Sequence, residues 1–343
     1  MKFSRRAVFT GTAGLLAAAL AIPSMSQAAE FNWRLQSNLN AGTPGYESVR
    51  VAFVERLERM SGGRMKVQMF PVGSLFPVKE GLEAVGGGVT EIGMMTGGYF
   101  TGKMGPIAVL ESGVPGAERT STERYAFFYQ KGFIDLAREA YSKHNVFYLG
   151  PNLSTPWEII SKKPIRGMAD FDGLKIRCFG IEAQWYESMG ASGVFLSGSE
   201  IYTALSTGVV DAVRWGSPQQ NFKIGLHEVG KYYIQPAPMP APNNNILINM
   251  DAWNTLPDDI KEMMDLAARM SSMEYLAGST AKDASALKKM QEAGMEVVTI
   301  PDDEWAAMEQ NVRKIWSAYG EEDELAARGV ALLQDFLKDL GRF

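Results

Sequence analysis

The sequence of 343 residues contains a single cysteine, Cys178, and two histidines, His144 and His227. One thiol excludes an internal disulfide, a paired-cysteine redox motif and a cysteine-cluster metal site. Two histidines are too few for a histidine-rich metal centre, and the G-x-S-x-G and H-E-x-x-H motifs of common hydrolases do not occur. The sequence therefore predicts a protein that is not an enzyme and holds neither a metal nor a cofactor.

Basic residues are also fewer than acidic residues. The chain has 34 basic and 39 acidic residues and a formal net charge of −5. Nucleic-acid-binding proteins carry an excess of basic residues that neutralise phosphates, so we expect no nucleic-acid partner. Hydrophobic residues make up 46% and charged residues 21%, which is typical of globular proteins, and the length suits two domains or one large α/β unit.

The first 28 residues do not have the pattern of a folded domain. Three basic side chains within positions 2–6 precede an apolar stretch over 7–22, and small residues stand at 26–28. This pattern predicts a cleaved secretory signal over 1–28. A transmembrane anchor is the alternative, but the stretch is short and ends near Pro23. The segment 4–6, Ser-Arg-Arg, resembles a twin-arginine export signal, and the Val-Phe at 8–9 departs from that pattern.

Removal of this signal takes away three basic residues and no acidic ones, so the formal net charge becomes −8. No later apolar run reaches the roughly 18 residues that a membrane span needs. Export without a disulfide and with a possible twin-arginine signal indicates a bacterial periplasm. We therefore expect a soluble periplasmic protein, exported by the general secretory or the twin-arginine route.

Hydrophobic periodicity predicts an α/β fold. Residues 31–35 and 65–69 alternate between apolar and polar, whereas apolar residues over 46–60 recur at three- and four-residue spacing. Strand, helix and strand in this order predict a parallel sheet covered by helices. A second α/β run begins near Asn152, and four prolines over 236–242 indicate a segment that crosses between lobes.

We therefore expect a two-lobed periplasmic-binding-protein-like fold, with helix-covered mixed sheets and a helical C-terminal region. The first lobe is predicted to comprise residues 29–151 with about 240–275, and the second 152–239 with about 276–343. Two such lobes, without a catalytic set, suggest a binding protein that closes on a small ligand.

Four motifs in the second half of the chain occur in a family-specific order. They are FDGLKIR over 171–177, MGA over 189–191, EIYTAL over 200–205 and GVVDA over 208–212, and NMDAWNTLP follows over 249–257. In these motifs the chain resembles the solute-binding subunit of tripartite ATP-independent periplasmic (TRAP) transporters, the DctP-type family, and its 2-oxo-acid-binding branch. The resemblance covers most of the mature chain. It implies capture of a small organic acid, either a dicarboxylate or a 2-oxo or 2-hydroxy acid, and delivery to the small and large integral membrane subunits.

The resemblance also assigns residues to the site. Arg177 corresponds to the family arginine that grips the ligand carboxylate, a role suited to two parallel guanidinium hydrogen bonds. Trp215 follows Arg214 at the position where the 2-oxo-acid branch has Glu-Trp, and that glutamate helps to hold a sodium ion. Pro156 aligns with a second sodium ligand, a glutamine. Arginine cannot ligate a cation and proline has no side-chain oxygen, so we hypothesise a metal-free site in which Arg214 supplies the positive charge.

Arg177 and Arg214 together carry a charge of +2, which predicts a dianionic ligand, or a monoanion assisted by a nearby acid such as Glu158. The alternative is that Arg214 points into solvent. Residues 243–245 are three asparagines, one of which is expected to face the ligand. The further candidates are Asn152, Tyr99 and Phe100, the last two lining the cleft or packing in the core, with Asn244 and, more weakly, Gln219.

Two other functions fit the same sequence features. They are an envelope enzyme acting on a small carboxylic acid and a binding protein that serves a chemoreceptor. The apolar composition of residues 332–343 allows a homodimer without requiring one. The sequence names neither the organic acid nor the oligomeric state.

Overall fold

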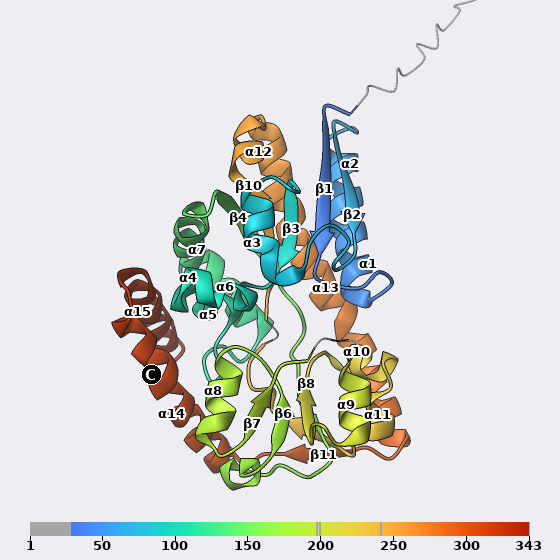
Figure 1. Ribbon diagram of the computed structural model, residues 1–343, viewed down its shortest axis with the longest axis vertical. Coiled ribbons are helices and arrows are strands. Elements are labelled where there is room, and N and C mark those ends of the chain that lie inside the picture. Colours follow the sequence, from blue (N-terminus) through green and yellow to red (C-terminus); the bar gives the residue numbers. More distant parts are fainter. Residues whose placement is uncertain (1–28, 197, 199, 241, 343) are drawn as a thin grey trace, which may run out of the picture.

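Figure 1 shows the computed structural model, which describes residues 29–342 apart from 197, 199 and 241. The predicted signal and its export motif lie outside the described residues. Two β-sheets, each flanked by helices, form the upper and lower parts of the molecule in this view. Among the helices that the structure describes, none combines the length and the apolar character that a membrane span requires.

The first sheet has five strands in the order β2-β1-β3-β10-β4. The predicted alternating strands at 31–35 and 65–69 are confirmed, and both β2 and β3 lie parallel to β1 as expected. The late strand β10 enters between β3 and β4 and runs antiparallel to both. The strands are β1 (Phe31–Ser37), β2 (Met65–Phe70), β3 (Ile92–Met95), β4 (Val146–Asn152) and β10 (Asn244–Asn249).

The second sheet has six strands in the order β11-β9-β5-β8-β6-β7. Strand β6 lies parallel to both β7 and β8, whereas β5 runs antiparallel to β8 and β9. Both sheets are therefore mixed, as predicted. The strands are β5 (Ile159–Ser161), β6 (Lys175–Arg177), β7 (Ser192–Val194), β8 (Ala212–Arg214), β9 (Tyr232–Gln235) and β11 (Glu296–Thr299).

Short helices connect the strands of each sheet. The helix predicted over 46–60 forms as three consecutive pieces, α1 (Pro44–Val49), a π-helical turn η1 (Arg50–Glu55) and α2 (Arg56–Met60). Its apolar residues Val49, Phe53 and Leu57 pack against the first sheet, which explains their helical spacing. The other helices of the upper part are η2 (Val78–Glu80), α3 (Gly81–Gly86), η3 (Gly97–Tyr99), α4 (Thr101–Met104), α5 (Pro106–Ser112), α6 (Ser121–Tyr129), α7 (Phe133–Ser142) and α12 (Met250–Thr255).

The second sheet is covered on one side by α9 and α11, whose apolar residues share a core with Ile160 and Val213 of the sheet. Helix α8 packs against β7 and against the C-terminal region. The helices around this sheet are η4 (Met168–Phe171), α8 (Ile181–Ser188), α9 (Ile201–Thr207), α10 (Pro218–Lys223) and α11 (Leu226–Val229).

One helix of 35 residues, α13 (Asp258–Glu292), extends along both parts of the molecule (Figure 1). At about 1.5 Å per residue it is about 50 Å long. Its first half packs on β4 and η1 and its second half on α10, so it connects the first sheet to the second. The expected lobe boundary near residue 275 therefore falls inside a continuous helix. The chain also crosses from β4 of the first sheet to β5 of the second, and from β9 of the second sheet back to β10 of the first.

The C-terminal helices differ from the expected assignment to the second lobe. Helix α14 (Asp302–Ala318) packs on α8, and after η5 (Tyr319–Glu321) helix α15 (Glu324–Asp339) packs on α5 and α7 of the upper part. Leu333, Phe336 and Leu337 are buried in that contact. These apolar residues of α15 are thus buried within the chain, and they give no separate support to the homodimer that the sequence allows.

Candidate ligand-binding site

Polar side chains gather where several strands of the first sheet end. Asn38 follows β1, Tyr99 lies in the turn after β3, and Asn244 at the start of β10 pairs in register with Asn152 at the end of β4. The Asn38 side-chain amide donates to Asn244 Oδ1 at 2.8 Å. Asn152 is buried, and its Oδ1 has no hydrogen-bond partner among the described residues. Ligands of open α/β sheets bind beside such carboxyl ends of strands, so this edge is a suitable binding surface.

The corresponding edge of the second sheet presents Arg177 at the end of β6. Only 5% of Arg177 is exposed. Its Nη1 donates to the Arg214 carbonyl at 2.8 Å, while Nε and Nη2 donate to the Leu196 carbonyl at 3.1 and 3.0 Å. A guanidinium has five N–H donors, so these bonds leave one on each terminal nitrogen. No carboxylate of the described residues forms an ion pair with Arg177, and burial lowers its pKa.

Three contacts join the two parts of the molecule around this arginine. The rings of Tyr99 and Phe179 lie 6.2 Å apart, and Lys79 Nζ lies 4.8 Å from the centre of the Phe195 ring. Lys223 Nζ donates to the Gly42 carbonyl at 2.6 Å. Arg177 and Asn38 of the first-sheet edge therefore lie on facing sides of this contact region. Tyr99 takes part in it, and burial raises the pKa of its hydroxyl.

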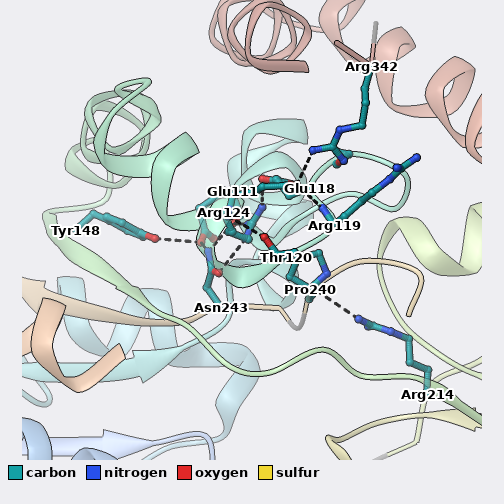
Figure 2. Close-up of polar contacts among 12 residues, drawn as sticks. Glu111, Glu118, Arg119, Thr120, Arg124, Tyr148, Arg214, Pro240, Asn243 and Arg342 are labelled. Carbon is teal, nitrogen blue, oxygen red and sulfur yellow. Dashed lines mark hydrogen bonds and ion pairs between the residues drawn. The ribbon is translucent and has the colours of Figure 1, made fainter. Parts of the chain in front are cut away.

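Arg214 lies at the end of β8, beside Arg177, and only 1% of it is exposed. The alternative of an arginine turned into solvent is wrong. Its Nη1 forms an ion pair of 2.8 Å with the buried Glu182 of α8, and its Nε donates to the Trp157 carbonyl at 3.1 Å. Its other terminal nitrogen reaches the carbonyls of Met239 and Pro240 in the crossing segment, the latter drawn in Figure 2.

The predicted site charge of +2 is incomplete because it omits Glu182. This side chain is 1% exposed, and burial raises its pKa while the nearby Arg214 and Arg177 lower it. The sequence signal for Glu182 is weak, because an acid in the first turn of a helix is also expected from the helix dipole. Only the fold places that first turn against the end of β8.

The remaining candidates are Trp215, Gln219, Phe100 and Glu158, and each of them has contacts within the chain. Trp215 is partly buried and packs with the α9–α11 core, and Gln219 lies in the first turn of α10, where its N–H donates to Asp283. Phe100 is 1% exposed and belongs to the main hydrophobic core, which favours the core alternative over the cleft. Glu158 accepts a hydrogen bond from the Tyr233 hydroxyl at 2.5 Å, and burial raises its pKa to about 7.

Asn243 and Asn245 belong to a second polar cluster, which sequence analysis did not predict. Arg124 donates to Asn243 Oδ1 at 3.0 Å and forms an ion pair of 2.7 Å with Glu118 (Figure 2). The Tyr148 hydroxyl lies within hydrogen-bond distance of both Glu111 and Asn245. Asn243 and Asn245 are fully buried, whereas Asn244 between them is partly exposed. Strand alternation therefore separates Asn244, on the binding edge, from its two neighbours.

The described residues contain no group of three His, Cys, Asp or Glu side chains arranged to hold a metal ion. At the two positions where the resemblance implied sodium ligands stand Pro156 and the ion-paired Arg214. These residues are not suited to bind a cation. The Arg214 guanidinium repels a cation, and the carboxylate of Glu182 is already ion-paired with Arg214.

Comparison with known proteins identifies the family of the chain. Residues 35–323 match the family described as "Bacterial extracellular solute-binding protein, family 7". The monocarboxylate 2-oxoacid-binding periplasmic protein of Nostoc sp. is 31% identical over 300 residues, which cover 85% of this chain and 80% of that protein. The C4-dicarboxylate-binding periplasmic protein of Rhodobacter capsulatus is 26% identical over 307 residues, covering 80% and 81%.

A solved TRAP transporter solute-binding protein from Bordetella bronchiseptica, with copurified calcium and picolinate in one active site, has the same fold. Its TM-score is 0.83 at 22% identity, and the match covers 92% of this chain and 93% of that one. These relatives are binding proteins, so the chain is not an enzyme. The family match extends over most of the length and includes the motifs around Arg177. The chain therefore belongs to family 7 of the bacterial extracellular solute-binding proteins, the solute-binding subunits of TRAP transporters.

Proposed function

We propose that this protein captures a small organic acid anion between its two lobes in the periplasm and delivers it to the small and large membrane subunits of a TRAP transporter. Arg177 binds the ligand carboxylate from the second lobe. Asn152, Asn244 and Tyr99 contact the ligand from the first-sheet edge. Dicarboxylates and 2-oxo or 2-hydroxy acids are the ligand classes that fit this site.

The observation that carries this proposal is the environment of Arg177. The guanidinium is buried, yet its acceptors within the described residues are the neutral carbonyls of Leu196 and Arg214. A buried charge without an ionic partner is costly. A ligand carboxylate supplies the missing negative charge and accepts the two remaining N–H groups in a bidentate geometry.

We further propose that this capture requires no metal ion. The Bordetella relative holds calcium beside picolinate. In this chain the guanidinium of Arg214, ion-paired with Glu182, stands where a cation ligand was expected, and Pro156 offers no side-chain oxygen to a cation. Arg214 also holds the carbonyls of Met239 and Pro240, so the same side chain connects the β8 edge to the segment that crosses between the sheets.

A thermal-shift screen of the signal-free protein against mono- and dicarboxylates tests the proposal. A ligand at a hundred times its dissociation constant adds about 2.7 kcal/mol of stability. Arg177→Ala is expected to abolish this shift, and Arg177→Lys to reduce it because an ammonium cannot form the bidentate pair. The exposed Arg166→Ala is the matched control and leaves the shift unchanged.

Two results would contradict the proposal. A shift that survives in Arg177→Ala refutes the role of this arginine. A shift that disappears after treatment with a chelator in sodium-free buffer, and returns with sodium or calcium, refutes the metal-free site while leaving acid binding intact.

A further inference from the structure

An acidic side chain that belongs to no recognised motif sets the charge of the binding site. Glu182 begins the first turn of α8, and both its carboxylate and the Arg214 guanidinium are inaccessible to solvent. We propose that Glu182 determines ligand selectivity: by neutralising Arg214 it leaves the site with a charge of +1, so that monoanionic carboxylates bind in preference to dianionic ones. This inference rests on the proposed function and specifies its substrate class.

The charges around Arg177 support this count. Glu182 acts on both arginines: burial lowers the pKa of Arg177 and the attraction of Glu182 opposes this, while burial raises the pKa of Glu182 and the two arginines oppose that rise. The three groups therefore form one coupled set of net charge +1. When the lobes close, a monoanion makes this set neutral, whereas a dianion leaves one buried negative charge without a partner.

Two further acids lie near this set. Glu158, whose pKa is raised to about 7, is largely protonated and neutral in mildly acidic solution. Asp283 accepts hydrogen bonds from Thr155, Ser217 and the Gln219 N–H and forms no ion pair with either arginine among the described residues. Selectivity is therefore best measured at about pH 6, where Glu158 is largely neutral and does not alter the net charge of the site.

The geometry indicates that Glu182 acts through its charge. Neither of its carboxylate oxygens accepts a well-aligned hydrogen bond among the described residues, although the ion-pair distance to Arg214 is 2.8 Å. Arg214 is instead positioned by the carbonyls of Trp157, Met239 and Pro240. Removal of the Glu182 charge is thus expected to change the field at the ligand more than the position of Arg214.

Calorimetry with a matched pair of ligands tests the inference. 2-Oxopentanoate and 2-oxoglutarate have the same chain length and differ in a terminal methyl or carboxylate group, and butyrate and succinate repeat the comparison without the oxo group. The wild type is expected to prefer the monocarboxylate of each pair. Glu182→Gln, with a site charge of +2, shifts the affinity ratio toward the dicarboxylate by about tenfold or more.

The double variant Glu182→Gln/Arg214→Gln is the control, because it restores the net charge of +1. Its ratio is expected to return toward the wild-type value, which a general loosening of the site would not produce. Arg214→Gln alone brings the charge to zero, so it weakens both ligands and the dicarboxylate more. If Glu182→Gln does not fold, Arg214→Gln tests the same inference by lowering the site charge instead of raising it.

The outcomes separate the two proposals. If the wild type binds acids through Arg177 but the ratio is the same in the charge variants, the selectivity inference is overturned and the proposed function stands. A wild-type preference for the dicarboxylate of both pairs also overturns the inference. If neither these four acids nor any other carboxylate binds, the proposed function itself fails.

Discussion

Two buried arginines in this protein make the same number of hydrogen bonds, but only one of them has a carboxylate partner. Arg124 in the upper part donates to Asn243, to Glu118 and to the Glu111 carbonyl, and it is 1% exposed. Arg177 at the β6 edge is 5% exposed and also makes three hydrogen bonds, all to neutral carbonyls. Arg124 has its counter-charge within the chain, and Arg177 does not.

This difference shows how a binding protein separates stability from function. The Arg124 cluster neutralises itself and fixes α5, α6 and the crossing segment, so its loss affects folding. Arg177 has no carboxylate partner among the described residues, and in the proposed function a ligand from solution supplies it. A buried charge that the chain does not satisfy is therefore better evidence of a ligand site than burial or hydrogen-bond number alone.

The largest expected effect is the loss of stability when Arg124 is replaced. Arg124→Met leaves Glu118 buried without a partner, so we expect the free energy of unfolding to fall by about 3–5 kcal/mol. Arg177→Met removes a charge that has no ionic partner, and we expect a change within about 1 kcal/mol. Urea denaturation of the two ligand-free variants measures both values. Equal losses at the two positions would show that the contrast in charge has no energetic consequence.

A second prediction concerns Glu111, which lies beside Arg124. Burial raises the pKa of this carboxyl to about 7, above its ordinary value of 4.5. The folded state therefore holds a proton that the unfolded state releases between these pH values. The resulting stability is fully present below pH 4.5 and is lost as the pH rises through 7.

Glu111→Gln removes this titration. Between about pH 5 and pH 8 the wild type is expected to lose about 2–3 kcal/mol more stability than the variant, since each pKa unit corresponds to about 1.4 kcal/mol. Urea midpoints across this pH range give the difference. Glu80→Gln, at an exposed position, is the control, and a variant curve parallel to that of the wild type would contradict the prediction.

Sequence reasoning predicted the parts of the fold that local patterns specify. Alternation in 31–35 and helical spacing in 46–60 arise from the burial of one face, so both elements were predictable. The middle of α13 was not, because its buried residues over 271–283 are Ser271, Ser272, Tyr275, Ser279 and Asp283. Ser272 bonds to the backbone at 151 and 153, and Asp283 bonds to Thr155 and to the start of α10, so hydrophobic periodicity carries little signal there.

The same limit applies to the site. Family motifs identified Arg177, because a continuous stretch of sequence carries it to the end of a strand. The partner of Arg214 depends on how α8 packs beside β8, two elements that are separated along the chain. The sequence therefore placed Arg177 at the end of a strand, where the structure has it, while its role in binding stays a prediction; the acid that pairs with Arg214 was missed.

The smallest expected effect concerns the contacts that keep Arg177 enclosed. Lys79 lies over the Phe195 ring, and such an exposed cation–π contact contributes about 0.5–1 kcal/mol. Lys79→Ala is therefore expected to weaken ligand binding by about two- to fivefold, because this contact joins the two lobes only when they are closed. The free energy of unfolding of the ligand-free protein should change by less than about 0.5 kcal/mol, because Lys79 and Phe195 are both exposed. Titration calorimetry of Lys79→Ala, Phe195→Ala and the double variant separates the contact from the individual side chains. If the effects of the single variants simply add, Lys79 and Phe195 do not act together, and the enclosure of Arg177 depends on the Tyr99–Phe179 and Lys223–Gly42 contacts instead.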